Sequence, residues 1–361
     1  MGFPGSQSPR RARILGLRIQ SVFLEAEIIA FLDRVRRVPV SGQPQVKGAK
    51  SMSYVFGPVR SRRLGLSLGV DLIPKKTCSF DCLYCQVGRT SFKTIETKTF
   101  IHASGVVKEV AKRLLKGAPD VITLAGSGEP TLCSEIDRVI ASIKEMTDIK
   151  VAVLTNGSLF WREEIRRRVL KADIIMPTLC TAFEHTFRRI HRPHSQLDLG
   201  AVVNGLKHLR RNYRGQLLLE VVFLAGINDS ENEVEGLKTL IDQIIPEKIH
   251  LNTVVRPPSD PGALPLDRKR LEAIETFLGP RAEIVAEVPP VAVGAGKETS
   301  SAIDLLDVVK RRPLTPADMA TTLKLSLEEV EDILKGLLIK GLIHRLEHSG
   351  TVYYLSDKRD A

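Results

Sequence analysis

Residues 77–86 read Thr-Cys-Ser-Phe-Asp-Cys-Leu-Tyr-Cys-Gln, a stretch that brings three of the chain's five cysteines into one short loop. Thiolates ligate zinc ions or iron–sulfur clusters, and a [4Fe–4S] cube normally takes four of them. Because Cys78, Cys82 and Cys85 supply three, one iron keeps an open position where a small molecule binds. A structural zinc site is the alternative, but the loop contains no fourth ligand and no second cysteine pair.

Around this loop, short β-branched runs alternate with segments of helical periodicity from residue 68 to about residue 287. Such alternation predicts a parallel sheet with crossover helices. The expected strands are 68–73, 120–125, 149–154, 173–177, 216–224 and 248–253, and the expected helices are 106–116, 135–146, 163–171, 199–211 and 231–245. The cysteine loop follows the first strand, so it lies at the carboxyl edge of the sheet, where a parallel barrel places its active face.

The ends of the chain differ from this central part. We interpret residues 1–51 as a basic, poorly ordered extension, with a basic arm that holds RNA as the alternative, and residues 52–288 as the main domain. The Pro/Gly-rich stretch 289–299 reads as a linker. Residues 300–361 show three helical segments and a hairpin, the pattern of a small winged helix-turn-helix domain.

Composition limits the class of protein. The chain has 361 residues, 43% of them apolar, which is enough for one large and one smaller domain. Cysteines gathered in one loop do not form a disulfide framework and indicate a reducing compartment, so we expect a cytoplasmic protein. No apolar stretch is long enough to span a bilayer. The net charge is +11, but the first 50 residues hold nine basic and three acidic side chains, which weakens the inference to nucleic acid.

A second glycine-rich segment follows the second expected strand and contains Gly126, Ser127, Gly128 and Glu129. Glycines let a ligand approach the backbone closely, and a carboxylate accepts hydrogen bonds from an ammonium group. A plain strand-to-helix turn is the alternative. The position of the segment, one strand beyond the cysteine loop and at the same sheet edge, favours a ligand site.

Further polar residues lie at the ends of other expected strands. Asn156 and Ser158 follow the third strand, where an ordinary Asn-Gly turn is the alternative. Glu220 lies inside an apolar strand, and a buried carboxylate must be paired, so we expect it to contact a ligand or an arginine. Asn252 closes the sixth strand. These four residues are candidate ligand contacts.

Basic residues near the cysteine loop are the candidates for catalysis or substrate recognition. Arg63 ends the segment Arg-Ser-Arg-Arg at 60–63, Lys76 precedes the loop, and Arg256 follows the sixth strand. A second basic segment, 188–194, follows the fourth strand. Clustered arginines suit phosphate or carboxylate recognition, and a lysine can form a Schiff base with a carbonyl group. A solvated surface is the alternative for the two basic segments and for Lys76, and a surface ion pair is the alternative for Arg256.

The spacing C-x3-C-x-aromatic-C resembles the signature of the radical S-adenosylmethionine (SAM) superfamily. Together with residues 56–65, 126–131 and 251–258, it makes the chain similar to a branch of Fe–S oxidoreductases related to the wyosine tRNA-base synthases. The resemblance covers about residues 53–287. It implies an α/β fold, a partial (β/α)6 TIM-like barrel.

This resemblance also implies the cofactors. The three thiolates hold a [4Fe–4S] cluster whose open iron binds SAM, and Ser127 to Glu129 stand where the family's Gly-Gly-Glu element holds the amino group of SAM. An electron from a donor such as ferredoxin or flavodoxin cleaves SAM to methionine and a 5′-deoxyadenosyl radical, which abstracts hydrogen from a substrate. The archaeal wyosine synthases carry further N-terminal cysteines, whereas residues 1–77 contain none, which argues against their pyruvate-condensing reaction here.

Three functions compete. The first is modification of RNA, foremost of a tRNA base. The second is the same chemistry on a protein or small metabolite, including glycyl-radical activation, with the winged helix as a docking module. The third is an Fe–S redox sensor that binds DNA, and the SAM element argues against it. Four acidic residues in 326–335, the expected recognition helix, would repel phosphates, so we do not expect DNA binding.

Overall fold

The computed structural model describes residues 28, 53–286, 302–323 and 325–356. Eight strands form the main sheet: β1 (Val55–Ser61), β2 (Gly65–Val70), β5 (Val121–Leu124), β6 (Lys150–Thr155), β7 (Ile174–Pro177), β8 (Gln216–Phe223), β9 (Lys248–Thr253) and β10 (Ala282–Ile284). Two short strands, β3 (Thr77–Cys78) and β4 (Phe92–Lys93), pair outside it. The helices of the main domain are α2 (Ala103–Leu114), the short 3-10 helix η1 (Pro130–Leu132), α3 (Ile136–Met146), α4 (Glu163–Val169), α5 (Glu184–His191), α6 (Leu199–Asn212), α7 (Glu231–Ile244) and α8 (Arg268–Leu278).

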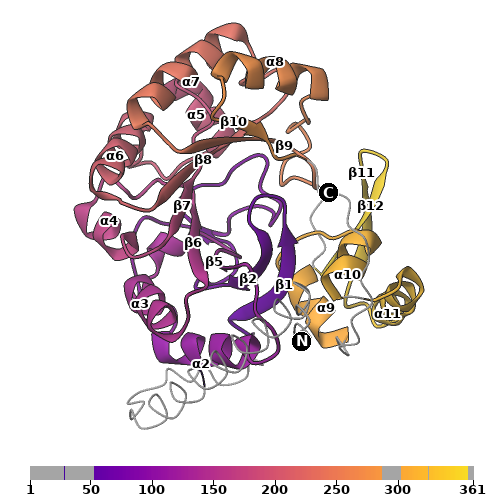
Figure 1. Ribbon diagram of the computed structural model, residues 1–361. Coiled ribbons are helices and arrows are strands. Elements are labelled where there is room, and N and C mark those ends of the chain that lie inside the picture. The colour runs from indigo at the N-terminus through magenta and orange to yellow at the C-terminus, as the bar shows by residue number, and fades with distance from the viewer. Residues whose placement is uncertain (1–27, 29–52, 287–301, 324, 357–361) are drawn as a thin grey trace, which may run out of the picture.

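The sheet has the order β1-β2-β5-β6-β7-β8-β9-β10 and curves like part of a barrel, with the larger helices along its outer face (Figure 1). Strands from β2 to β10 are parallel to their neighbours, while β1 forms an antiparallel hairpin with β2. No pairing joins β1 to β10 in the described residues, so the barrel is open. The predicted α/β fold with a partial barrel is confirmed.

Apolar residues cover both faces of these parallel strands, as crossover helices require. On the outer face, α3 buries Ile136, Val139, Ile140 and Ile143, spaced at three and four residues along one side of the helix. On the inner face, a smaller apolar cluster includes Met176 of β7. Burial on both faces explains why the strands read as continuous apolar runs in the sequence.

All six predicted parallel strands are present, and β9 covers the predicted residues 248–253. Periodicity did not indicate β1, β10, α5 or α8. A Gly-Pro pair at residues 57–58 interrupts β1, β10 has only three half-buried residues, and α5 falls in the segment singled out for its basic residues.

The C-terminal part consists of α9 (Ala302–Val309), α10 (Pro316–Leu323), α11 (Leu327–Ile339) and the hairpin β11 (His344–His348) and β12 (Thr351–Leu355), in the predicted order. Ser326 and Glu329 form a capping box at the start of α11. Phe56 and Val59 of β1 are buried in the same apolar cluster as the residues of α9, α10 and α11. The C-terminal part is therefore packed against the first strand of the main domain, as Figure 1 shows.

Other predictions concern regions with few described residues. The stretch 289–299, predicted to be a linker, lies outside the described residues. Of the first 52 residues, the structure describes Ile28, which is helical and buried in the main core. This residue belongs to the fold. Among the described helices, none combines the length and apolar character needed to cross a membrane.

Candidate active site

The cysteine loop leaves the carboxyl end of β2 and is fixed by the end of α5. The backbone NH groups of Asp81 and Leu83 donate to the carbonyls of His191 and Ile190, both at 2.9 Å. The backbone NH of His194 donates to the Ser79 carbonyl at 2.8 Å. The basic segment 188–194, proposed from sequence to read a substrate, thus serves first as the backbone support of the loop.

The three loop thiols are partly buried, and two of them, Cys78 and Cys82, have raised pKa values. Burial raises the pKa of the Cys78 thiol to about 12, and the nearby Glu129 carboxylate adds to the effect. Burial likewise raises the pKa of Cys82 well above its usual value. Such thiols need a strongly positive group to stabilise their thiolates, which is what an iron–sulfur cluster supplies.

Hydrogen-bond donors beside the sulfur atoms of Cys78 and Cys82 also support an iron–sulfur cluster. The backbone NH of Phe80 and the Nδ2 of Asn156 each donate to Cys78 Sγ at 3.5 Å. The Nδ1 of His191 lies 3.2 Å from Cys82 Sγ. In the described part of the chain, no three potential ligands converge on a point that fits a single metal ion. Each thiolate of a cube binds a different iron, and three thiols are the donor set that a [4Fe–4S] cluster with one open iron requires.

An aromatic wall closes the loop on the side of α5. The His191 ring lies 5.0 Å from the Phe80 ring, 5.3 Å from the Phe187 ring and 5.9 Å from the Tyr84 ring, measured between centroids. Complete burial lowers the pKa of His191 to about 3, so the imidazole is neutral at physiological pH. A neutral ring can donate one hydrogen bond to Cys82 without adding charge.

The glycine-rich segment after β5 packs directly on the start of the cysteine loop. The NH of Lys76 donates to the Ser127 carbonyl at 2.9 Å, and the NH of Glu129 donates to the Thr77 carbonyl at 3.1 Å. A Cβ added at Gly128 would lie 1.9 Å from that Thr77 oxygen. Only glycine permits this approach, so the segment and the loop form one backbone unit.

The Glu129 carboxylate is buried and bonded within the protein. Its Oε1 accepts hydrogen bonds from Thr131 N at 3.0 Å, Thr131 Oγ1 at 2.6 Å and Thr155 Oγ1 at 2.6 Å. Its Oε2 accepts one bond, from Asn156 N at 2.7 Å. Burial raises the pKa of this carboxyl group while these donors oppose the shift. Glu129 thus ties the segment after β5 to the end of β6 next to Cys78, and Oε2 keeps a lone pair for a ligand.

Ser127 is held by a residue that the sequence did not indicate, Asp71, which follows β2. Its carboxylate accepts hydrogen bonds from Ser127 Oγ at 2.6 Å and from Ser127 N at 3.2 Å. The same carboxylate pairs with Nε of Arg311, which comes from the C-terminal part, at 3.3 Å, and both side chains are buried. Arg311 also donates to the Ser53 carbonyl and lies over the Phe56 ring.

Asn156 and Ser158 also support the loop from behind. Asn156 Nδ2 donates to Ser79 Oγ at 2.8 Å, and the hydroxyls of Ser79 and Ser158 are 2.6 Å apart. Ser158 is completely buried. The structure therefore brings six predicted SAM residues, 126–129, 156 and 158, together around the start of the cysteine loop.

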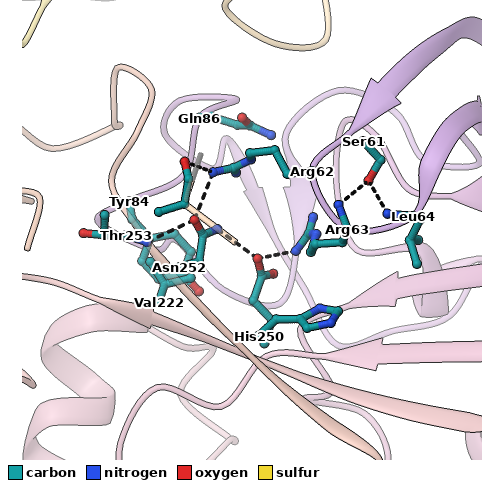
Figure 2. A network of polar contacts seen from close by, with 12 residues as sticks. Ser61, Arg62, Arg63, Leu64, Tyr84, Gln86, Val222, His250, Asn252 and Thr253 are labelled. Carbon is teal, nitrogen blue, oxygen red and sulfur yellow. Dashed lines mark hydrogen bonds and ion pairs between the residues drawn. The ribbon is translucent and has the colours of Figure 1, made fainter. Parts of the chain in front are cut away.

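Glu220 and Asn252 lie in a second group with two arginines, and Figure 2 shows Asn252 beside Arg62 and Arg63. Arg63 forms an ion pair with Glu220, which therefore contacts an arginine, one of the two alternatives predicted from the sequence. Arg62 NH1 donates to Asn252 Oδ1 at 3.0 Å, and Asn252 Nδ2 donates to Glu220 Oε1 at 3.0 Å. These contacts span β8, β9 and the turn between β1 and β2.

A pocket of about 220 Å³ opens beside this network and reaches the cysteine loop. It is lined by Arg62, Arg63, Tyr84, Cys85, Gln86, Val87, Glu220, Val222, Asn252, Thr253, Val254, Val255 and Arg256. Two of the three predicted catalytic candidates, Arg63 and Arg256, thus border one space next to Cys85, a predicted cluster ligand. The third, Lys76, has positive φ and donates through Nζ to the Gly88 carbonyl, and it does not line this pocket.

Sequence reasoning missed two residues at the site. Asp71 directly follows β2 and lies inside the apolar strand predicted at 68–73, which is the same signal that singled out Glu220. His191 was included in a basic segment, although its i−4 spacing to Phe187 indicates a buried position. Each contacts a residue of the predicted motifs: Asp71 accepts a hydrogen bond from Ser127, and His191 lies beside Cys82.

Comparisons with known proteins agree with this geometry. Residues 72–237 match the family model of the Radical SAM superfamily. A UPF0026 protein of Methanocaldococcus jannaschii is 33% identical over 315 residues, which cover 85% of this chain and 97% of that protein. The chain belongs to the UPF0026 family of the radical SAM superfamily. It is an enzyme whose cofactors are a [4Fe–4S] cluster and SAM.

Other relatives match over smaller parts of their length. The GTPase Obg of Brachyspira hyodysenteriae is 34% identical over 86% of this chain and 46% of that protein. The dual-specificity RNA methyltransferase RlmN of Buchnera aphidicola is 26% identical over 48% of this chain and 50% of that protein. The chain thus spans about half the length of these two. A radical SAM methyltransferase from Sphaerobacter thermophilus resembles the structure over 60% of this chain and 65% of that chain, at 16% identity and a TM-score of 0.46.

Proposed function

We propose that this enzyme abstracts a hydrogen atom from an RNA substrate, a tRNA base, in a reaction related to those of the wyosine branch. The observation that carries the proposal is the pocket between the cysteine loop and the arginines of the β1–β2 turn. It lies beside Cys85, where hydrogen abstraction takes place, and its basic lining suits a nucleotide. The relative named as an RNA methyltransferase supports the same substrate class.

In this proposal Cys78, Cys82 and Cys85 hold the cluster, and the segment 126–129 forms the wall against which SAM lies. When bound, the cluster and SAM supply a carbon radical that removes hydrogen from the substrate. The protein's own part is placement and shielding. Glu129 and Asp71 fix the backbone of the SAM wall, and the aromatic wall around His191 keeps water from the loop.

The C-terminal part presents different charges on its two exposed elements. Helix α11 exposes Glu328, Glu329, Glu331 and Asp332, which repel a phosphate backbone. The hairpin exposes both Arg345 and Glu347 between half-buried residues of β11, so it lacks the excess of negative charge that α11 carries. We therefore assign the contact with RNA to the hairpin of this winged helix. We expect no contact between α11 and DNA. The electron donor is a ferredoxin or flavodoxin, and the compartment is the cytoplasm.

Anaerobic reconstitution of the full chain tests the proposal. The holoenzyme is incubated with SAM, dithionite and bulk tRNA, and the nucleosides are then analysed by mass spectrometry. We expect 5′-deoxyadenosine and a mass change in one tRNA nucleoside. The matched control is Cys82→Ala, which lacks a cluster ligand and should give neither product.

A different outcome would assign another substrate. If 5′-deoxyadenosine accumulates while every tRNA nucleoside keeps its mass, the RNA proposal is wrong. The same reaction mixture with a cell extract freed of nucleic acid then tests a protein or a small metabolite, the alternative for which the pocket is also large enough.

A further inference from the structure

Two hollows meet beside the cysteine loop, one in the main domain and one at the C-terminal part. The first is the pocket of about 220 Å³ described above. The second, of about 30 Å³, has room for little more than a water molecule. Gln86 and Val87 line both, and the smaller hollow is also lined by Lys75, Lys310, Arg311 and Arg312. The end of α9 therefore brings basic side chains to the edge of the substrate pocket.

Positive charge exceeds negative charge around these hollows. Six side chains act on one another electrostatically: Arg62, Arg63, Arg256, Arg312, Glu220 and Asp318. Four guanidinium groups face two carboxylates, which leaves an excess of two positive charges. Arg63 and Glu220 are paired directly, whereas Arg256 and Asp318 are 3.8 Å apart, at the outer limit of an ion pair. The excess lies on Arg62, Arg256 and Arg312.

Arg256 is the clearest sign of a missing partner. The residue is 8% exposed and lines the larger pocket. Its Nε is buried and has no hydrogen-bond partner among the described residues, and its NH1 donates to Gln86 Oε1 over 3.4 Å, a long bond. A buried donor left unsatisfied costs about 1–3 kcal/mol, so such a group is normally bonded to something.

Arg312 shows the same feature from the C-terminal part. Its Nε is also buried without a partner among the described residues. Burial, reinforced by the charge of Arg256, lowers the pKa of Arg312 to about 9, and it does the same to Arg62. Guanidinium groups placed close together in a poorly solvated space repel one another unless an anion lies between them.

We propose that these arginines form a phosphate-binding subsite at the edge of the substrate pocket, completed by Arg312 of the C-terminal part. A phosphate dianion matches the excess of two charges, and its oxygens match the planar forks of several guanidinium groups. The subsite holds a phosphate of the substrate beside Cys85. The inference rests on the proposed function in that it assigns this anion to the substrate and not to SAM.

Binding of inorganic phosphate tests the subsite directly. The holoenzyme is titrated with phosphate at constant ionic strength, and its melting temperature is measured, with acetate titrated in parallel. Arg312→Gln removes one fork, and Arg138→Gln is the control, an exposed arginine whose ion pair with Glu135 lies within one turn of α3. We expect phosphate to raise the melting temperature of the parent enzyme and of Arg138→Gln, and to bind Arg312→Gln about tenfold or more weakly.

A second readout separates a binding role from a structural one. Because Arg312 is repelled by its neighbours, Arg312→Gln should melt no lower than the parent enzyme when phosphate is absent. A marked fall in melting temperature, or equal phosphate affinity in both proteins, overturns the proposal. A preference for acetate over phosphate overturns the assigned ligand class. If SAM affinity falls by the same factor as phosphate affinity, the anion is the carboxylate of SAM and the proposal is wrong.

Two further titrations identify the source of the phosphate. A nucleoside 5′-monophosphate and bulk tRNA are compared for their competition with inorganic phosphate. Competition by tRNA that Arg312→Gln weakens places a phosphate of the RNA in the subsite. Competition by the mononucleotide alone supports the subsite and contradicts the RNA substrate, so failure of the proposed function is distinguishable from failure of this inference.

Discussion

Replacing Glu129 separates two roles that a carboxylate can play beside a cluster. In one, the side chain is chiefly a ligand for the ammonium group of SAM, as the sequence motif implies. In the other, it is chiefly a structural acceptor that joins the segment after β5 to the end of β6. The structure shows four internal hydrogen bonds to this carboxylate, so we expect the structural role to dominate.

The contacts give the size of the effect. Glu129→Ala leaves four buried donors without this acceptor, at about 1–3 kcal/mol each: Thr131 N, Thr131 Oγ1, Thr155 Oγ1 and Asn156 N. The sum, about 4–12 kcal/mol, is comparable to the whole stability of a typical domain, about 5–15 kcal/mol. Glu129→Gln keeps one oxygen for the three donors at Oε1 and loses only the bond to Asn156 N, at about 1.5–3 kcal/mol.

Urea unfolding of the iron-free protein, together with iron analysis after anaerobic reconstitution, measures both variants. We expect Glu129→Ala to be strongly destabilised and to hold little iron, since Asn156 also donates to Cys78. Glu129→Gln should keep its iron and lose an intermediate amount of stability. If Glu129→Ala keeps the stability and iron content of the parent and loses only SAM affinity, the structural argument is refuted and the ligand role stands.

Three further outcomes are expected. Gly128→Ala should lose its iron, because the new methyl group would collide with a backbone carbonyl of the cysteine loop, whereas Gly336→Ala, where no atom lies within 4 Å, should keep iron as the parent does; equal iron in both would contradict this. His191→Phe keeps the aromatic wall but removes the hydrogen bond to Cys82, so the reduction potential of the cluster, followed by electron paramagnetic resonance, should change while iron content does not. Arg311→Met should weaken SAM affinity, measured by equilibrium dialysis, by removing the partner of Asp71; unchanged affinity would show that this ion pair does not position Ser127.

The fold was predictable from the sequence because its parallel strands are buried on both faces. Six of them are short apolar runs between helices of regular period, so these six strands and the edge of the sheet at which they end could be predicted. The hairpin β1 and the three-residue β10 carry no such period. Their places at the two edges of the open sheet depend on tertiary contacts, those of Phe56 with the C-terminal part among them.

The candidate site was predictable to the extent that its residues follow strand ends. The three cysteines and the segment 126–129 lie together as the spacing indicated. Which partner each side chain has was not predictable, because Glu220 meets Arg63 and Ser127 meets Asp71 over separations of 157 and 56 residues. Such pairs depend on strand order and side-chain direction, which a single sequence does not specify.

The contact between the C-terminal part and β1 affects both proteolysis and thermal unfolding of the chain. Phe56 and Val59 contribute to the apolar cluster of α9–α11, and Arg311 bonds to the Ser53 carbonyl and to Asp71. A protease cut within residues 289–299, the stretch predicted to be a linker, would therefore leave both pieces associated as one particle. Heating should melt them in a single cooperative transition, because neither piece keeps its buried surface without the other.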